Sequence, residues 1–90
     1  MTANQRDRRK YDRLFYHSTI QMTNQTQISR LGHTLNLSDG GLLIKCDDNY
    51  IPEIDEIIEV QSMSFPEAPI KKVIVRRITK EGQIAVQFIE

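Results

Sequence analysis

Apolar side chains recur at every second position in several short segments of this chain, which is the spacing of a β-strand with one buried face. The clearest examples are Leu42, Ile44 and Cys46 in one segment and Ile84, Val86 and Phe88 in another. Glycine, proline and polar residues interrupt such segments about every 8–12 residues, as in β-sandwiches and barrels. No segment shows the apolar spacing of an amphipathic helix. The pattern predicts an all-β fold.

The sequence predicts short strands at residues 14–23, 26–37, 42–46, 56–62, 70–79 and 83–89. The last two are joined at Lys80-Glu81-Gly82, which has the glycine of a tight hairpin connection. A small antiparallel barrel suits such strands, because closing the sheet removes edges that would otherwise promote aggregation. We therefore expect one domain, a six-stranded antiparallel barrel over residues 14–90. A flexible arginine-rich segment over residues 1–13 precedes it.

The end of the second predicted strand carries polar side chains beside a glycine-rich turn. Alternation along this strand places His33, Leu35 and Leu37 on one face and Thr34 and Asn36 on the other. If the leucines face the core, Asn36 and Ser38 lie together on the outer surface, because side chains alternate along a strand. Gly40 and Gly41 follow and remove side chains beside them. A ligand could therefore approach the backbone there.

Charge is balanced overall but segregated along the chain. The 90 residues include 12 basic and 12 acidic side chains, so bulk charge does not favour binding to nucleic acid or to anionic membrane. Basic residues concentrate at 1–13 and 71–80 and acidic residues at 47–59, which suits a small anionic ligand better. No apolar run approaches the roughly 20 residues that span a bilayer. No apolar signal-peptide stretch is present either. We therefore expect a cytoplasmic protein.

Metal binding and catalysis find little support in the sequence. Cys46, His17 and His33 lack the spacing of zinc ligands, and the acidic stretch at 47–51 lacks the glycine and terminal glutamate of a calcium loop. Cys46 alternates with apolar residues, so it is expected to be a small core residue. The carboxylates at 53–56 have nothing nearby to desolvate them for acid–base work. We expect no enzyme, no catalytic residue, no metal site and no cofactor.

Two short motifs carry the functional hypothesis. Arg9 and Arg13 form an R-x-x-x-R pattern before the first predicted strand, and Asn36, Ser38 and Gly41 form an N-x-S-x-x-G pattern at the strand-to-turn junction. Alone, the first is typical of a solvated tail and the second of an ordinary turn. Together and in this order on an all-β chain, they resemble the paired signature of PilZ domains, RxxxR and D/N-x-S-x-x-G. The resemblance covers roughly residues 8–89.

This resemblance implies a barrel that binds the bacterial second messenger cyclic di-GMP across its outer face. Arg9 and Arg13 would hold guanine edges and phosphates, because a guanidinium offers paired donors to both. Asn36 would bind a guanine edge, Ser38 a guanine or phosphate oxygen, and Gly41 would hold the turn open. Many relatives have aspartate in place of the asparagine. A neutral amide gives up a charge-assisted hydrogen bond, so a modest affinity is expected.

Arg8 adds an expectation about stoichiometry. In the PilZ family the residue before RxxxR resembles a switch, in which an arginine accompanies a stacked pair of ligands and an apolar residue accompanies a single one. Arg8 occupies that position here. The resemblance therefore implies two cyclic di-GMP molecules per protomer, with Arg8 in the site. The alternative is that Arg8 is one more solvated charge in a basic tail.

Two other functions remain open on the sequence alone. The chain could be an interaction module that has the PilZ fold but binds no ligand, although members of that kind typically lack the arginines. It could also be a small barrel that binds single-stranded nucleic acid with an arginine-rich arm. The zero net charge and the lack of exposed aromatic residues on the strands weaken that alternative.

The expected partners are cyclic di-GMP and an unidentified downstream effector protein, because a lone receptor domain must act on another protein. Many relatives carry a helix after the barrel, whereas this sequence ends at Glu90. Apolar positions near Leu31, Phe88 and Ile89 are therefore expected to be exposed. A homodimer is one way to cover them.

Overall fold

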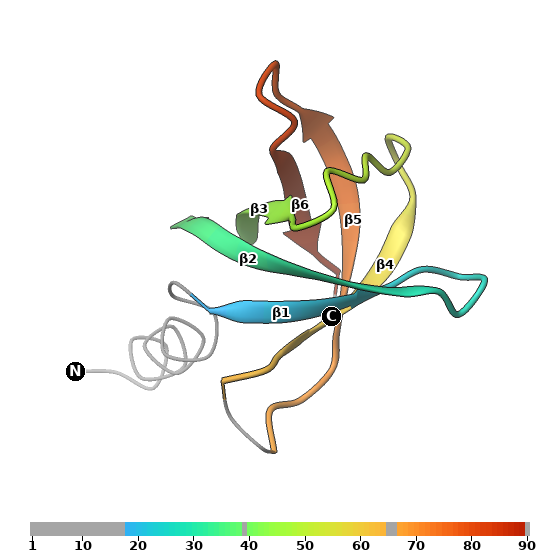
Figure 1. The fold of residues 1–90 in the computed structure, drawn as a ribbon, viewed down its shortest axis with the longest axis vertical. Coiled ribbons are helices and arrows are strands. Elements are labelled where there is room, and N and C mark those ends of the chain that lie inside the picture. The colour runs from blue at the N-terminus through green and yellow to red at the C-terminus, as the bar shows by residue number, and fades with distance from the viewer. Residues whose placement is uncertain (1–17, 39, 65–66, 90) are drawn as a thin grey trace.

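The computed structural model describes residues 18–38, 40–64 and 67–89. Its strands are β1 (Thr19–Thr23), β2 (Ser29–Ser38), β3 (Gly41–Cys46), β4 (Ile57–Ser62), β5 (Lys71–Ile78) and β6 (Ile84–Phe88). They are antiparallel and close into a barrel in the order β1-β2-β3-β6-β5-β4, with β4 paired to β1 (Figure 1). The predicted six-stranded all-β barrel is confirmed. Within the described ranges, no helix is long and apolar enough to cross a membrane.

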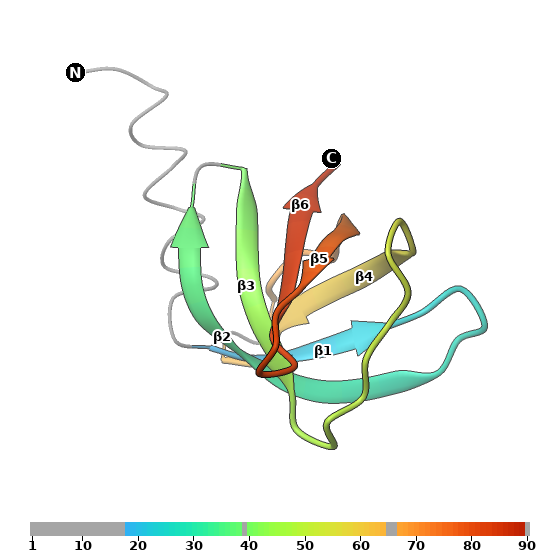
Figure 2. The same cartoon turned by 90° about the horizontal axis from the view of Figure 1, so that it is seen from above.

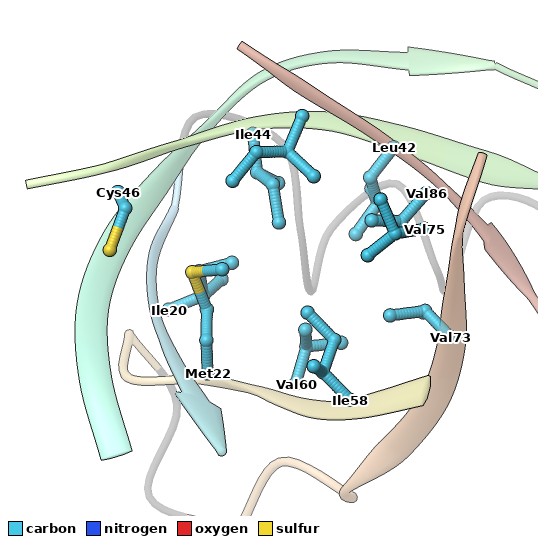
Figure 3. Close-up of a cluster of buried hydrophobic side chains, with 11 residues drawn as sticks. Ile20, Met22, Leu42, Ile44, Cys46, Ile58, Val60, Val73, Val75 and Val86 are labelled. Carbon is cyan, nitrogen blue, oxygen red and sulfur yellow. The ribbon is translucent and has the colours of Figure 1, made fainter. Parts of the chain in front are cut away.

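Alternating apolar side chains fill the barrel interior (Figure 3). The buried cluster comprises Ile20, Met22, Leu42, Ile44, Cys46, Ile58, Val60, Val73, Val75, Ile84 and Val86. Isoleucine and valine predominate in it, because branched side chains pack well on a pleated sheet. Fully burying one such side chain contributes about 1.5–3 kcal/mol, so each member of this cluster stabilises the fold appreciably. The core positions predicted from alternation in β3, namely Leu42, Ile44 and Cys46, are confirmed.

Two strands carry a β-bulge, at which one extra residue interrupts the regular pairing. In β2 the register shifts between Thr34 and Asn36, and in β5 it shifts between Val75 and Arg77. Because side chains alternate with a period of two, an extra residue reverses which face the following side chains occupy.

The bulge in β2 corrects the predicted orientation of that strand. The expected alternation fails in the upstream half of the strand, where His33 is exposed and Thr34 is buried. After the bulge the alternation reverses, so that Leu37 packs against the core and Asn36 is exposed. Asn36 therefore lies on the outer surface, although the upstream half of the strand faces the opposite way from the prediction.

The strand ends agree with the sequence prediction to within a few residues, with one difference in the connection from β1 to β2. Residues 26–28 were expected in the second strand but belong to this connection. Gln27 adopts a positive φ of 67°, and the Asn24 side chain accepts hydrogen bonds from the backbone N–H groups of Thr26 and Ile28. This side chain therefore competes with the ladder and delays the start of β2.

The turn between β2 and β3 lies at the same rim of the barrel as the end of β6 (Figure 2). The Phe88 N–H donates to the Gly40 carbonyl oxygen at 2.8 Å, which joins the turn to β6. Residues 14–17 of the first predicted strand, and the segment 1–13, lie outside the described residues. The expectation that residues 1–13 are flexible therefore stays a prediction.

Candidate functional site

The described structure contains one of the two motifs. The other motif, with Arg9 and Arg13, lies outside the described residues, as does Arg8. Asn36 lies within β2, Ser38 is the last residue of that strand, and Gly41 begins β3 opposite it. The short turn therefore brings the backbones of the second motif to one corner of the barrel.

Asn36 presents its carboxamide on the outer face of β2. Its Oδ1 accepts a hydrogen bond from the Leu37 backbone N–H at 2.9 Å, and because that N–H can only donate, the bonded atom must be the carbonyl oxygen. The Nδ2 group has no hydrogen-bond partner among the residues described in the structure. Its two N–H donors can therefore meet an acceptor on a ligand, such as O6 or N7 of guanine.

The two glycines of the turn differ in what they require. Gly40 has a φ of 81°, and a Cβ added there would meet nothing within 4 Å. Gly41 is buried, and a Cβ there would lie 2.5 Å from the carbonyl oxygen of Val86. Gly41 therefore allows β3 and β6 to approach each other. The motif alone did not predict this packing role.

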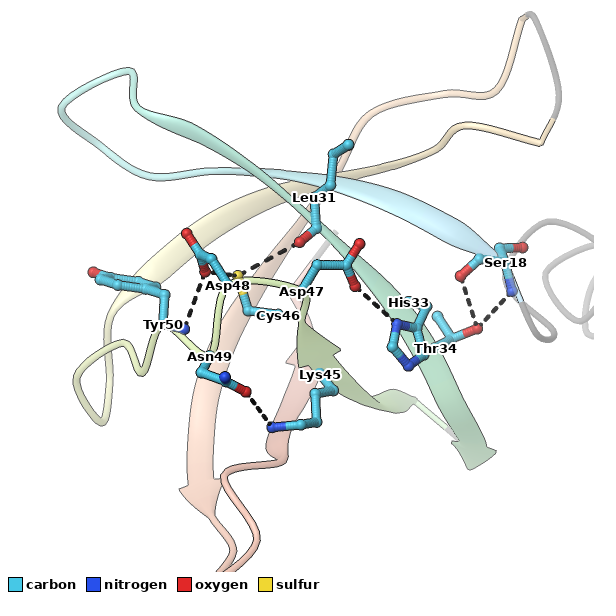
Figure 4. Close-up of polar contacts among 10 residues, drawn as sticks. All are labelled: Ser18, Leu31, His33, Thr34, Lys45, Cys46, Asp47, Asp48, Asn49 and Tyr50. Carbon is cyan, nitrogen blue, oxygen red and sulfur yellow. Dashed lines mark hydrogen bonds and ion pairs between the residues drawn. The ribbon is translucent and has the colours of Figure 1, made fainter.

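The chain enters β1 directly beside β2. The Ser18 N–H donates to Thr34 Oγ1 at 2.8 Å (Figure 4). The Thr34 N–H donates to the Ser18 carbonyl oxygen at 2.9 Å. Both residues are buried, so these hydrogen bonds fix the start of β1 against β2. Thr34 precedes Asn36 by two positions. The segment that carries the arginine motif is thus joined to the barrel close to Asn36.

A second polar group consists of Arg30, Cys46, Asp48 and Tyr50 and is called the Arg30 cluster below. Arg30 Nη1 lies 2.6 Å from Asp48 Oδ2, and the guanidinium carbon lies 3.8 Å from the centroid of the Tyr50 ring. Asp48 Oδ1 accepts from the Tyr50 N–H at 3.1 Å and from the Cys46 thiol at 3.0 Å (Figure 4). Because each member contacts another and Tyr50 packs against the core, the cluster stabilises the fold.

The contacts within the Arg30 cluster shift two pKa values. The pKa of Asp48 is lowered, first by the hydrogen bond from the Cys46 thiol and then by the Tyr50 N–H and by Arg30. The pKa of Cys46 is raised, first by burial and then by the hydrogen bond to Asp48. A buried thiol with a raised pKa stays protonated near neutral pH. Cys46 therefore has the environment of a core residue and not that of a nucleophile.

Elsewhere the described residues offer little for ligand chemistry. Across residues 18–38, 40–64 and 67–89, no group of three His, Cys, Asp or Glu side chains could hold a metal ion. A shallow hollow of about 530 Å³ lies beside the β1–β2 connection and contains none of the predicted site residues. Its lining residues are Thr23, Asn24, Gln25, Gln27, Ile57, Glu59, Lys72 and Ile89.

Comparison with known families identifies the fold. A family model for the PilZ domain matches residues 7–90, which include both motifs and all the strands. The chain belongs to the PilZ domain family. No curated protein and no solved structure matches it. PilZ domains are binding and adaptor domains associated with cyclic di-GMP and are not known as catalysts, which agrees with the resemblance drawn from the motifs.

The bulges of this PilZ domain were not predicted, although the sequence contains a signal for them. In β5 the inward-facing residues are Val73, Val75 and Ile78, so their spacing changes from two to three. In β2 the inward-facing residues Thr34 and Leu37 are also three apart. A change from even to odd spacing within one strand indicates an inserted residue.

Proposed function

We propose that this PilZ domain is a receptor for cyclic di-GMP that passes the binding event to another protein. One observation carries the proposal. The family match includes both motifs, and Asn36 lies on the outer face close to the anchored start of β1. The chain therefore keeps the arginine motif close enough to Asn36 for both to reach the same ligand.

That reach follows from the length of the connection. Arg13 precedes Ser18 by five residues. Five residues span at most about 18 Å when fully extended, and neighbouring strands lie about 4.8 Å apart. The connection can therefore cover three or so strands, which is enough for Arg13 to contact a dinucleotide on the outer face beside Asn36.

The chemistry of the two motifs suits the two halves of the ligand. The guanidinium groups of Arg9 and Arg13 can each donate two parallel hydrogen bonds, either to O6 and N7 of guanine or to a phosphate. The Asn36 Nδ2 donors add a contact to a guanine edge, and Ser38 is proposed to bind a guanine or phosphate oxygen. Gly41 contributes by allowing the strands at this corner to pack closely.

Replacement of Arg9 or Arg13 by alanine tests the proposal. Each variant should bind cyclic di-GMP at least about tenfold more weakly in a calorimetric titration, since a paired arginine–guanine contact is worth about 1–3 kcal/mol. Lys80→Ala is the charge-matched control, because Lys80 lies on the exposed connection between β5 and β6, and it should bind as the parent does.

Two outcomes would contradict the proposal. A parent protein that binds no cyclic di-GMP would favour the interaction module without ligand. Tight binding to single-stranded RNA that weakens steeply between two salt concentrations would favour the nucleic-acid alternative.

Arg8 is proposed to set the stoichiometry. A stacked pair of ligands brings four phosphates and four guanines together, and a third guanidinium offsets part of that charge and can stack on a purine. The parent should therefore bind two cyclic di-GMP molecules per protomer, and Arg8→Leu should bind one. A parent titration that saturates at one ligand, or an Arg8→Leu variant that still binds two, would falsify this role but not the receptor function.

The bound receptor is proposed to act on a downstream effector protein in the cytoplasm. A homodimer is a separate proposal. It is supported by the exposure of Leu31 (51%) and Ile89 (44%), whereas Phe88 is partly buried against the core. Sedimentation at high micromolar protein concentration tests it, and a monomer there would contradict it.

A further inference from the structure

The two bulges lie at the same level of the barrel and turn the residue that follows each of them outward. The pairings across the sheet are Asn36 with Leu43, Leu43 with Ala85, and Ala85 with Arg77. These four residues form a continuous line over β2, β3, β6 and β5 and are called the outer row below. Without the bulges, Asn36 and Arg77 would point into the barrel, because alternation from the buried Thr34 and Val75 would place them inward.

The middle of the outer row is apolar. Leu43 and Ala85 are partly buried, and their neighbours on each strand point into the core. Ala85 contributes only a methyl group. The flat face of a purine can lie on such a surface, because bases stack on apolar side chains in protein sites.

Arg77 differs from the other arginines that the structure describes. Arg30 belongs to the Arg30 cluster, and the neighbouring Arg76 donates from Nε to Gln87 Oε1 at 2.9 Å and lies 3.6 Å from Asp55. Arg77 is exposed and has neither a hydrogen bond nor an ion pair within the described part of the chain. None of the described residues therefore occupies its guanidinium donors.

We propose that Arg77 is a further ligand-binding residue and that the outer row is the surface on which the ligand lies. A guanine of cyclic di-GMP lies flat on Leu43 and Ala85, and Arg77 donates to its O6 and N7. This inference rests on the proposed receptor function and extends the site beyond the two motifs.

The dimensions of the outer row suit a ligand with two bases. Asn36 and Arg77 are three strand spacings apart, or about 14 Å. They can therefore contact different parts of a dinucleotide that lies over Leu43 and Ala85 between them. Arg77 also discriminates between bases, because adenine presents a donor where guanine presents O6. Cyclic di-AMP should accordingly bind much more weakly than cyclic di-GMP.

Calorimetric titration with cyclic di-GMP tests the role of Arg77. Arg77→Ala should weaken binding by about tenfold or more. Arg77→Lys should also weaken it, because lysine keeps the charge but lacks the paired donors. The matched control is Arg76→Ala, which removes the same charge one residue away and should change affinity by less than about threefold. Thermal melts of all variants check that the barrel is intact.

A second measurement examines the apolar part of the outer row. In the parent, the methyl NMR signals of Leu43 and Ala85 should shift on adding cyclic di-GMP, and Ala85→Leu should weaken binding by raising the surface. Unshifted methyl signals, parent-like binding by Arg77→Ala, or equal losses in Arg76→Ala and Arg77→Ala would each overturn the inference. Each of these outcomes leaves the receptor function standing, whereas a parent that binds no cyclic di-GMP overturns the receptor function itself.

Discussion

The Arg30 cluster and the outer row use arginine in opposite ways within one small barrel. Arg30 is stacked on Tyr50 and held by Asp48, and its side chain is only 30% exposed. Arg77 is exposed and has no partner within the described ranges. An arginine that is stacked and ion-paired in the free protein contributes to the folded state. An arginine whose donors are free contributes instead when a ligand arrives.

The largest expected effect on stability comes from replacing Gly41. This residue belongs both to the proposed binding corner and to the packing of the barrel, so the binding face and the stabilising interior are not separate there. Gly41→Ala should lower the free energy of unfolding by about 3 kcal/mol or more, because the added Cβ would lie 2.5 Å from the backbone oxygen of Val86. Gly40→Ala is the control and should cost only about 1 kcal/mol, through its positive φ. Urea unfolding measures both. Equal stabilities for the two variants would contradict the packing role.

Replacing Arg30 and Arg77 by alanine, one at a time, tests the contrast between the Arg30 cluster and the outer row. Arg30→Ala should lower the free energy of unfolding by about 1–2 kcal/mol, through loss of the Tyr50 stacking and the Asp48 contact, and should leave ligand affinity unchanged. Arg77→Ala should change the free energy of unfolding by less than about 0.5 kcal/mol. Paired denaturation and titration experiments measure both quantities. A loss of affinity in Arg30→Ala would remove the contrast between the two regions.

The smallest effect concerns the pH dependence of the Arg30 cluster. The folded-state pKa of Asp48 is below its ordinary value, so the carboxylate stabilises the fold above the unfolded pKa. This contribution is lost as the pH falls through the folded-state pKa. The difference in urea midpoint between the parent and Asp48→Asn should thus be larger near a pH of about 7 than near about 3. Equal differences at the two pH values would contradict the stabilising role of the Asp48 carboxylate.

Much of the barrel could be predicted from the sequence, because its signals are local. Alternation along β3 and β6 placed Ile44 and Val86 in the core, and both are buried. The turn at residues 38–41 was also recognisable from its glycines. These features depend on neighbouring residues of the chain, so no knowledge of the tertiary structure was needed.

The remaining features depend on contacts between distant segments. The packing role of Gly41 appears only when Val86 lies beside it, and the role of Thr34 appears only when Ser18 bonds to it. The outward orientation of Arg77 requires a bulge, for which the change of apolar spacing in β5 is a local signal but whose pairing with Ala85 appears only in the folded sheet. Residues 8, 9 and 13 lie outside the described residues, so their part in the site stays a prediction.

The hydrogen bonds between Ser18 and Thr34 have a consequence for affinity. They fix the start of β1, so that Arg13, which precedes Ser18 by five positions, is tied to a point near Asn36. A binding element tethered this closely acts as if it were present at an effective concentration in the millimolar range. A separate peptide carrying residues 1–17 would need to be supplied at about that concentration to restore binding to a barrel lacking them. Covalent attachment thus makes the combined affinity of individually weak arginine contacts much higher than the contacts would give separately.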